Sequence, residues 1–220
     1  NLRVYGRLGQ LGAMKKKNPH KMIALCGCMM QEPEVIEKLK KSYRFVDLIF
    51  GTHNIYKFAE LLTSAMQSYR TVIDIWKDTD KIVEDLPVER KYPFKSGVNI
   101  MFGCNNFCSY CIVPYARGPE RSRAFDEVLA DCRRAVADGF PELVLTGVNT
   151  CAYSDAGRGL GELVHAVAGI DGDFRIRLSS TEPAPDNRGL LDVMASEPKV
   201  CRFLHLALQH GSNRILKLMN

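Results

Sequence analysis

The sequence predicts an α/β protein built from two successive α/β units with parallel sheets. Apolar strand-like runs alternate with helical patterns along the 220 residues, and a hydrophobic content of 46% is enough to bury a core. The alternation breaks once, where residues 71–96 mix charges, prolines and short apolar stretches. We therefore predict an N-terminal unit over residues 1–70, a connector over residues 71–96 and a second unit over residues 97–220.

The N-terminal unit is expected to begin with a helix, because apolar residues recur at helical spacing over residues 2–14. Residues 15–17, all lysine, then form a basic last turn that we expect to be solvated, and Asn18-Pro19 ends the helix. A strand, a helix, a strand and a helix follow over residues 22–25, 33–39, 45–50 and 55–66. This αβαβα order is typical of a small α/β domain with a parallel sheet.

Strand–helix repeats resume at Gly97. The expected strands cover residues 97–102, 142–146, 174–178 and 203–208, the helices cover residues 125–137, 161–168 and 190–195, and a last helix begins near Asn213. Four such units in succession form part of a (β/α) barrel wall without closing it. In these barrels functional groups lie at the carboxyl ends of the strands, so we expect a site at that edge.

Three cysteines follow the first of these strands in the pattern Cys104-x-x-x-Cys108-x-x-Cys111. A structural zinc site is closed by four ligands, and an ordinary iron–sulfur carrier uses four cysteines. Three thiolates therefore leave one metal position open to a ligand that is not protein. Chelation of S-adenosylmethionine (SAM) by a four-iron cluster requires such an open iron, so the pattern predicts radical chemistry at a [4Fe–4S] cluster.

Polar residues also follow the other three expected strands. They are Gly147-Val148-Asn149, Ser179-Ser180-Thr181-Glu182 and Gln209-His210-Gly211-Ser212. Glycine and serine form turns wherever strands end, so a turn alone explains any one cluster. Because all these clusters are expected at the same edge of the sheet, a binding site there is favoured over unrelated turns. Arg117, Arg121 and Arg123 lie beside the cysteine loop in sequence, and we expect them to contact phosphate or the SAM carboxylate.

Further motifs surround the cysteines. They are residues 99–102 (NIMF) and 112–123 (IVPYARGPERSR) on either side of the loop, with residues 26–34 (CGCMMQEPE) and 47–54 (DLIFGTHN) upstream. Over nearly the whole chain these motifs resemble the MiaB/MtaB family of tRNA methylthiotransferases, which are radical SAM enzymes. The resemblance implies a flavodoxin-like α/β domain followed by a partial (β/α) radical SAM barrel, both truncated in this chain.

The resemblance also implies an activity, the addition of a methylthio group to C2 of N6-isopentenyladenosine beside the tRNA anticodon. The implied cofactors are a [4Fe–4S] cluster on Cys104, Cys108 and Cys111 with SAM, and an auxiliary [4Fe–4S] cluster for which Cys28 matches the third ligand. Six residues are assigned to SAM by the same resemblance: Tyr110, Gly147, Asn149, Ser180, Glu182 and Gln209. The implied partners are tRNA, SAM and an electron donor such as flavodoxin or ferredoxin, with the enzyme a monomer.

The family extends beyond these motifs on both sides. It has a strand and two further auxiliary-cluster cysteines before the region that matches Asn1, and two more β/α units and an RNA-binding TRAM domain after the last helix. We therefore expect this chain to be a fragment that holds the loop cluster but not the auxiliary cluster and does not thiolate tRNA. Sheet edges exposed after Leu208 should make it prone to aggregation.

Several alternatives stay open at this point. Residues 145–149 (LTGVN) and 177–183 (RLSSTEP) look more like the MtaB branch, which modifies N6-threonylcarbamoyladenosine, so the two halves could differ in origin. A non-enzymatic iron–sulfur electron carrier would close the site with Cys151 as a fourth ligand. An RNA-binding module with a dormant cluster is a third possibility.

Composition limits the remaining classes. A net charge of +5 permits nucleic-acid binding without demanding it. No run approaches the roughly 20 apolar residues of a membrane helix, and the first residues lack a signal-peptide layout, so we expect a cytoplasmic protein without membrane association. In that reducing compartment the eight cysteines should be thiols, and we expect Cys132 and Cys201 to be small buried hydrophobes.

Overall fold

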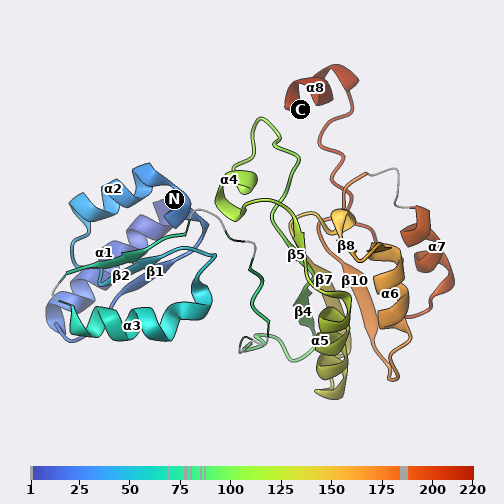
Figure 1. Cartoon of the computed structure of the whole chain (residues 1–220), viewed down its shortest axis with the longest axis horizontal. Helices are drawn as coiled ribbons and strands as arrows, with labels where there is room; N and C mark the ends of the chain where they lie inside the picture. Colours follow the sequence, from blue (N-terminus) through green and yellow to red (C-terminus); the bar gives the residue numbers. More distant parts are fainter. Residues whose placement is uncertain are drawn as a thin grey trace. The chain divides into compact units, whose positions relative to one another are not determined.

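The structure, a computed structural model, describes residues 2–68, 70–76, 79, 81–84, 86, 88–183 and 188–220. The chain divides into two compact units (Figure 1). The first consists of Asn1–Thr79 and Tyr115–Arg117, and the second of Asp80–Pro114 and Gly118–Asn220. Parts of the predicted connector lie outside the described residues.

The first unit is a three-stranded parallel sheet in the order β1-β2-β3 with helices on both faces. Its elements are α1 (Leu2–Lys17), β1 (Ala24–Cys26), η1 (Cys28–Gln31), α2 (Pro33–Ser42), β2 (Leu48–Phe50), η2 (Ile55–Lys57), α3 (Phe58–Gln67) and β3 (Val72–Asp74). The expected αβαβα order is present, and β3 adds a strand within residues that we placed in the connector. The alternation of apolar residues over 72–75 is the pattern of this strand, which pairs with β2.

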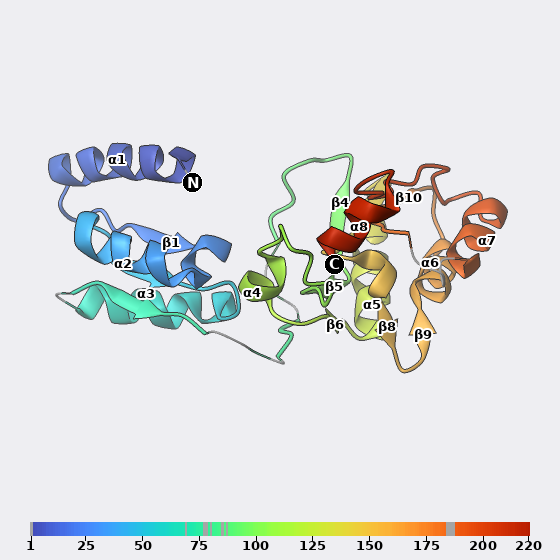
Figure 2. The same cartoon turned by 90° about the horizontal axis from the view of Figure 1, so that it is seen from above.

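The central strand β2 shows how the sheet separates two cores. Leu48 and Phe50 pack with Leu61 and Ala65 of α3, whereas Ile49 faces the cluster that α1 and α2 build. Successive side chains of a strand point to opposite faces, so three consecutive buried residues require cover on both sides. Figure 2 shows α1, α2 and α3 as the layers that supply it.

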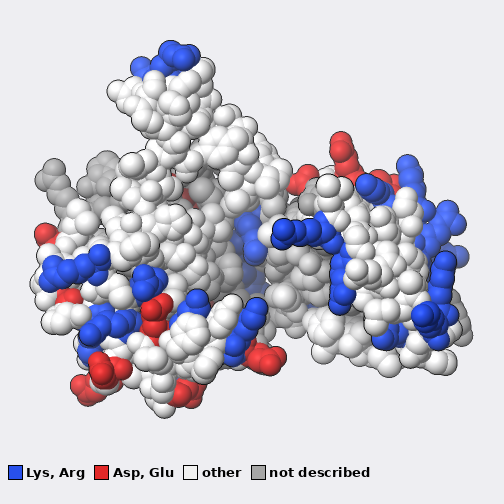
Figure 3. Space-filling model, turned by 180° about the vertical axis from the view of Figure 1, so that it is seen from behind, with Lys and Arg blue, Asp and Glu red and all other residues white. Residues whose placement is uncertain are grey.

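Charge is unevenly divided between the units. Residues 1–79 contain 13 Lys and Arg against 7 Asp and Glu, whereas residues 80–220 contain 17 against 18. α1 alone carries five of these cations and no acidic residue. On the face drawn in Figure 3, Lys and Arg lie at several places on the first unit. The excess positive charge of the chain therefore belongs to the first unit.

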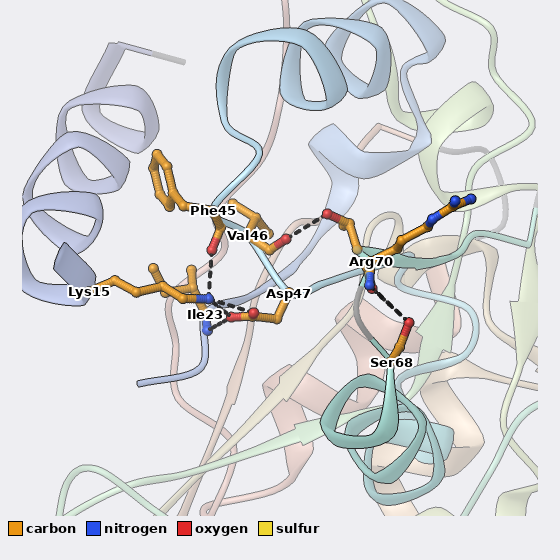
Figure 4. Close-up of polar contacts among 8 residues, drawn as sticks. Lys15, Ile23, Phe45, Val46, Asp47, Ser68 and Arg70 are labelled. Atoms are coloured by element: carbon orange, nitrogen blue, oxygen red, sulfur yellow. Dashed lines mark hydrogen bonds and ion pairs between the residues drawn. The ribbon is translucent and has the colours of Figure 1, made fainter. Parts of the chain in front are cut away.

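The last turn of α1 differs from its expected solvated state. Lys15 Nζ donates to Phe45 O at 2.9 Å and binds both carboxylate oxygens of Asp47, which also accepts a hydrogen bond from Ile23 N at 2.7 Å (Figure 4). The expectation is wrong for Lys15, because this helix end packs against the segment that leads into β2. Lys16 and Lys17 are exposed as expected.

The second unit has a parallel sheet in the order β10-β7-β4. From residue 96 onward the chain forms β4 (Ser96–Asn99), β5 (Met101–Phe102), α4 (Val113–Arg117), β6 (Arg121–Ser122), α5 (Phe125–Ala137), β7 (Glu142–Thr146), η3 (Thr150–Ala152), β8 (Ser154–Asp155), β9 (Arg158–Gly159), α6 (Leu160–Ala168), β10 (Arg175–Leu178), α7 (Arg188–Ser196) and α8 (Asn213–Met219). The sheet and its helices share one large core. The predicted α/β class with parallel sheets is confirmed.

Two of the expected strands need correction. The strand over residues 97–102 divides at Ile100 into β4, which pairs with β7, and β5, which pairs antiparallel with β6. The strand over residues 203–208 does not form, and within the described residues this segment makes one isolated bridge, between Leu206 and Thr181. Leu204 is partly buried against the large core, but Phe203 and Leu208 are 52% and 65% exposed, so much of this apolar segment stays in solvent.

None of the helices in the described part of the chain is both long and apolar enough to cross a bilayer.

Candidate functional site

The cysteine loop leaves β5 and returns to β6 through a narrow neck. At its start Gly103 has φ of +73°, and a Cβ there would lie 1.8 Å from Pro119 O. Cys104 N donates to Gly118 O at 3.2 Å across the same neck. Only glycine lets the two ends of the loop approach this closely, because it has no Cβ and tolerates a left-handed backbone.

A pair of side chains closes the neck. Asn105 donates from its backbone and its amide to the Glu120 carboxylate at 3.2 and 3.3 Å, and Glu120 N donates back to Asn105 Oδ1 at 3.1 Å. These three hydrogen bonds join residues 15 apart in sequence. The loop is therefore a defined closed turn, and neither residue was predicted from the sequence.

All three loop cysteines are free thiols. Cys104 is buried, Cys108 and Cys111 are partly exposed, and a turn with Cys111 N donating to Cys108 O at 2.9 Å brings the last two together. Burial raises the pKa of Cys104, and the Glu120 and Glu182 carboxylates raise it further. A bound metal cation has the opposite effect on the pKa of Cys104, because coordination to a metal deprotonates a thiol.

The donor set fits the implied [4Fe–4S] cluster. In the described part of the chain, no group of three or more His, Cys, Asp and Glu side chains is arranged to hold one metal ion. A single ion needs its thiolates at about 2.3 Å. A four-iron cluster instead binds each thiolate at a separate iron, which three free thiols in one eight-residue loop supply.

Glu182 joins two of the predicted rim segments. Asn106 Nδ2 of the cysteine loop donates to the Glu182 carboxylate at 3.2 and 2.9 Å, and Asn149 Nδ2 donates to the same carboxylate. The structure therefore brings Asn149 and Glu182 together with the cysteine loop. Asn106 was missed, although two adjacent amides between the first two cysteines were a visible signal.

Asn149 also offers an acceptor. The side chain is 5% exposed, and its Oδ1 has no hydrogen-bond partner among the described residues. The amide orientation is fixed, because a carboxylate accepts only and the nitrogen must face Glu182. A buried acceptor without a donor is costly, so this atom calls for a ligand or water with an N–H or O–H group.

The other predicted SAM residues lie in tight or strained backbone. A Cβ at Gly147 would lie 2.7 Å from Met101 Cγ, so the loop after β7 passes close to β5. Ser180 and Gln209 both have φ of +58°, a strain of the kind that clusters at functional sites. Gln209 is exposed.

Tyr110 is 56% exposed beside the thiols. Its pKa is raised, first by loss of hydration and then by the neighbouring Cys108. The ring therefore lies next to a predicted cluster ligand and is accessible to solvent or to a ligand.

The expected ligand role of Arg123 is wrong. Its guanidinium is buried, where it forms ion pairs with Glu84 and Asp131 and donates to Asn99 O at 2.8 Å. Burial opposes ionisation of Asp131, but hydrogen bonds from Arg123 and Arg134 outweigh it and hold the pKa of that carboxyl below 3.8. Arg123 thus fastens residue 84 of the connector to α5.

The remaining cysteines differ from one another. Cys151 lines a cavity of about 740 Å³ with residues of α6 and α7, and none of the three loop cysteines is among its lining residues. Cys132 is fully buried, which raises the pKa of its thiol to about 12 and confirms its role as a small hydrophobe. Cys201 is only partly buried. Cys28 begins η1 in the first unit as a partly buried free thiol.

Comparison with known proteins covers both units. The sequence profile of the radical SAM superfamily matches residues 98–220. The whole chain is 52% identical to a tRNA-2-methylthio-N(6)-dimethylallyladenosine synthase of Lachnoclostridium phytofermentans and 51% identical to the protein of that name from Acetivibrio thermocellus. A third, from Syntrophomonas wolfei, is 46% identical over 99% of the chain. The chain spans about half the length of these relatives, 49%, 46% and 49% respectively.

Proposed function

The chain belongs to the radical SAM superfamily, and we propose that in a protein of its relatives' length it is part of a tRNA methylthiotransferase. The reaction adds a methylthio group to C2 of N6-isopentenyladenosine beside the anticodon. The observation that carries this proposal is the match of both units, at 46–52% identity, to synthases named for N(6)-dimethylallyladenosine. N(6)-dimethylallyladenosine and N6-isopentenyladenosine are two names for the same nucleoside.

The geometry of the rim supports the proposed binding of SAM. A [4Fe–4S] cluster on Cys104, Cys108 and Cys111 supplies the electron that cleaves SAM. Asn149 Oδ1 accepts a hydrogen bond from the SAM amino group, which satisfies its unpaired acceptor. Glu182 holds Asn149 in this orientation and ties it to the cysteine loop through Asn106.

Four further residues shape the SAM pocket. Gly147 keeps the loop after β7 close to β5, and Tyr110 offers its exposed ring to the adenine. Ser180 and Gln209 present polar groups from strained turns to the ribose and carboxylate. One SAM donates methyl to sulfur, and a second supplies the 5′-deoxyadenosyl group that takes the C2 hydrogen.

The first unit supplies sulfur and binds RNA in this proposal. Cys28 is one of three ligands of an auxiliary [4Fe–4S] cluster, and its free, partly buried thiol is compatible with that role. The exposed cations of α1 and α2 suit a phosphate backbone, because polyanion binding needs concentrated positive charge. We further propose a flavodoxin-like fold for this unit, a partial (β/α) barrel for the second, and a monomeric cytoplasmic enzyme that receives electrons from flavodoxin or ferredoxin.

The MtaB-type enzyme and the electron carrier have less support. The relatives that match residues of both halves carry the dimethylallyladenosine name, which outweighs the short MtaB-like motifs at 145–149 and 177–183. An electron carrier would need Cys151 as a fourth ligand, but the cavity that Cys151 lines with residues of α6 and α7 includes none of the three loop cysteines.

Nucleoside analysis of tRNA tests the proposed function. A strain that lacks the gene should accumulate N6-isopentenyladenosine and lose its 2-methylthio derivative, and the full-length gene should restore the product. A Cys104→Ala gene should not restore it. Loss of the threonylcarbamoyl-derived product with the isopentenyl one intact would reverse the choice of substrate.

A further inference from the structure

Buried polar atoms without partners gather at the carboxyl end of the first sheet. Gln31 Nε2, Thr52 Oγ1 and Asn54 Oδ1 are all buried, and none has a hydrogen-bond partner among the described residues. They follow β1 and β2 along the chain, at the edge where open α/β sheets bind ligands. Buried polar groups are normally paired, so this concentration points to a group that the protein binds there.

Gln31 shares a face with Cys28. The two residues are the first and last of η1, a single 3₁₀ turn in which Met30 N donates to Gly27 O at 2.9 Å. In a 3₁₀ helix, side chains three residues apart eclipse each other. The Gln31 amide and the Cys28 thiol therefore project from the same side of this turn.

Gly51 makes room for the amide. A Cβ at this position would lie 2.6 Å from Gln31 Nε2 and 3.5 Å from Asn54 Oδ1. Asn54 is fully buried and its orientation is fixed, because Nδ2 donates to Asp74 O at 2.8 Å. Because Asn54 Oδ1 is an acceptor, the Gln31 amide is expected to place its nitrogen, and not its oxygen, at the position beside Gly51. A primary amide has two donors, so a bond to Asn54 would still leave one for a ligand.

We infer that Gln31 is a positioning residue that donates a hydrogen bond to the sulfur-containing group bound at Cys28, with the Thr52 hydroxyl as a second donor. The inference rests on the proposed auxiliary cluster. Hydrogen bonds to cluster sulfurs stabilise the more negative, reduced state and raise the reduction potential. Gln31 would thus set how readily this cluster accepts an electron, without being a metal ligand.

The test uses the full-length protein with Cys104, Cys108 and Cys111 all replaced by Ala, so that only the auxiliary cluster binds iron. Its reduction potential is measured by a titration followed by electron paramagnetic resonance. Gln31→Met removes the donors at similar volume and should lower the potential. A tenfold change in the reduction equilibrium corresponds to about 59 mV for one electron. Met29→Leu, in the same turn, is the matched control and should leave the potential unchanged.

The outcomes separate the two proposals. An unchanged potential in Gln31→Met with full iron content overturns the inference, and absence of iron from the triple-Ala parent overturns the auxiliary cluster itself. If Gln31→Met loses iron, Gln31→Glu serves as the second variant. It keeps the shape of the side chain and replaces the amide donor by a carboxylate anion. A lower potential or selective loss of iron in folded Gln31→Glu supports the contact. An unchanged potential, or an unfolded protein, assigns Gln31 to packing and overturns it.

Discussion

Replacing Gly103 by alanine should open the neck of the cysteine loop. The left-handed backbone at φ +73° costs a residue with a Cβ about 1–2 kcal/mol. The new Cβ would lie 1.8 Å from Pro119 O and 2.4 Å from Pro119 C, so the facing backbone must move by about 1.6 Å to bring the shorter distance to an ordinary contact of 3.4 Å. Overpacking of this kind costs about 1–3 kcal/mol. We expect a total loss of about 2–5 kcal/mol in the free energy of unfolding.

Gly97→Ala is the matched control. Gly97 lies in β4, is exposed, and has no atom within 4 Å of the site of a Cβ, so its replacement should change stability by less than about 0.5 kcal/mol. Urea denaturation gives both stabilities, and iron content after anaerobic reconstitution reports the loop itself. Equal urea midpoints and equal iron in the two variants would refute the close approach that we describe.

Three further predictions concern iron, pH and RNA. Cys104→Ala should remove the iron of the reconstituted chain, whereas Cys151→Ala should keep about four irons, and equal loss would favour the electron carrier. The lowered pKa of Asp131 stabilises the fold above pH 3.8, and this stability is lost as pH falls through the folded-state pKa, so Asp131→Asn should show a shallower acid slope of the urea midpoint. Replacing exposed Lys16 and Lys17 by Glu should weaken tRNA binding by the full-length protein and reduce its salt slope by about 2, and an unchanged slope would exclude this face.

The regular elements could be predicted where one periodicity dominates. The bounds of α5 and β7 match their expected ranges, 125–137 and 142–146, because the helical pattern and the alternation there are unambiguous. The expected strand over 203–208 failed because alternation shows which face is apolar but not whether a neighbouring strand is in reach, and among the described residues only Leu206 of this segment forms a bridge, to Thr181. The break at Ile100 depends on a hydrogen bond from Arg123 N at 2.9 Å, which local sequence does not reveal.

The sequence could predict which types of residue form the candidate site, but not which of them form hydrogen bonds and ion pairs with one another. The three cysteines and the rim residues Asn149 and Glu182 follow from motifs, since each chemistry needs its own residue type. Arg123 was misread because its acidic partner Glu84 is 39 residues away and burial cannot be seen in a charge cluster. Asn106 was missed for the same reason, because its hydrogen-bond partner is a carboxylate 76 residues later in the chain.

Both candidate sites hold buried amide atoms without a hydrogen-bond partner among the described residues. Beside the cysteine loop the acceptor Asn149 Oδ1 would suit the positively charged amino group of SAM. At the carboxyl end of the first sheet the donor Gln31 Nε2 and the acceptor Asn54 Oδ1 both lack a partner, and of these two only the donor would suit negatively charged sulfur. The contact that we propose at Cys28 therefore belongs to Gln31 and not to Asn54.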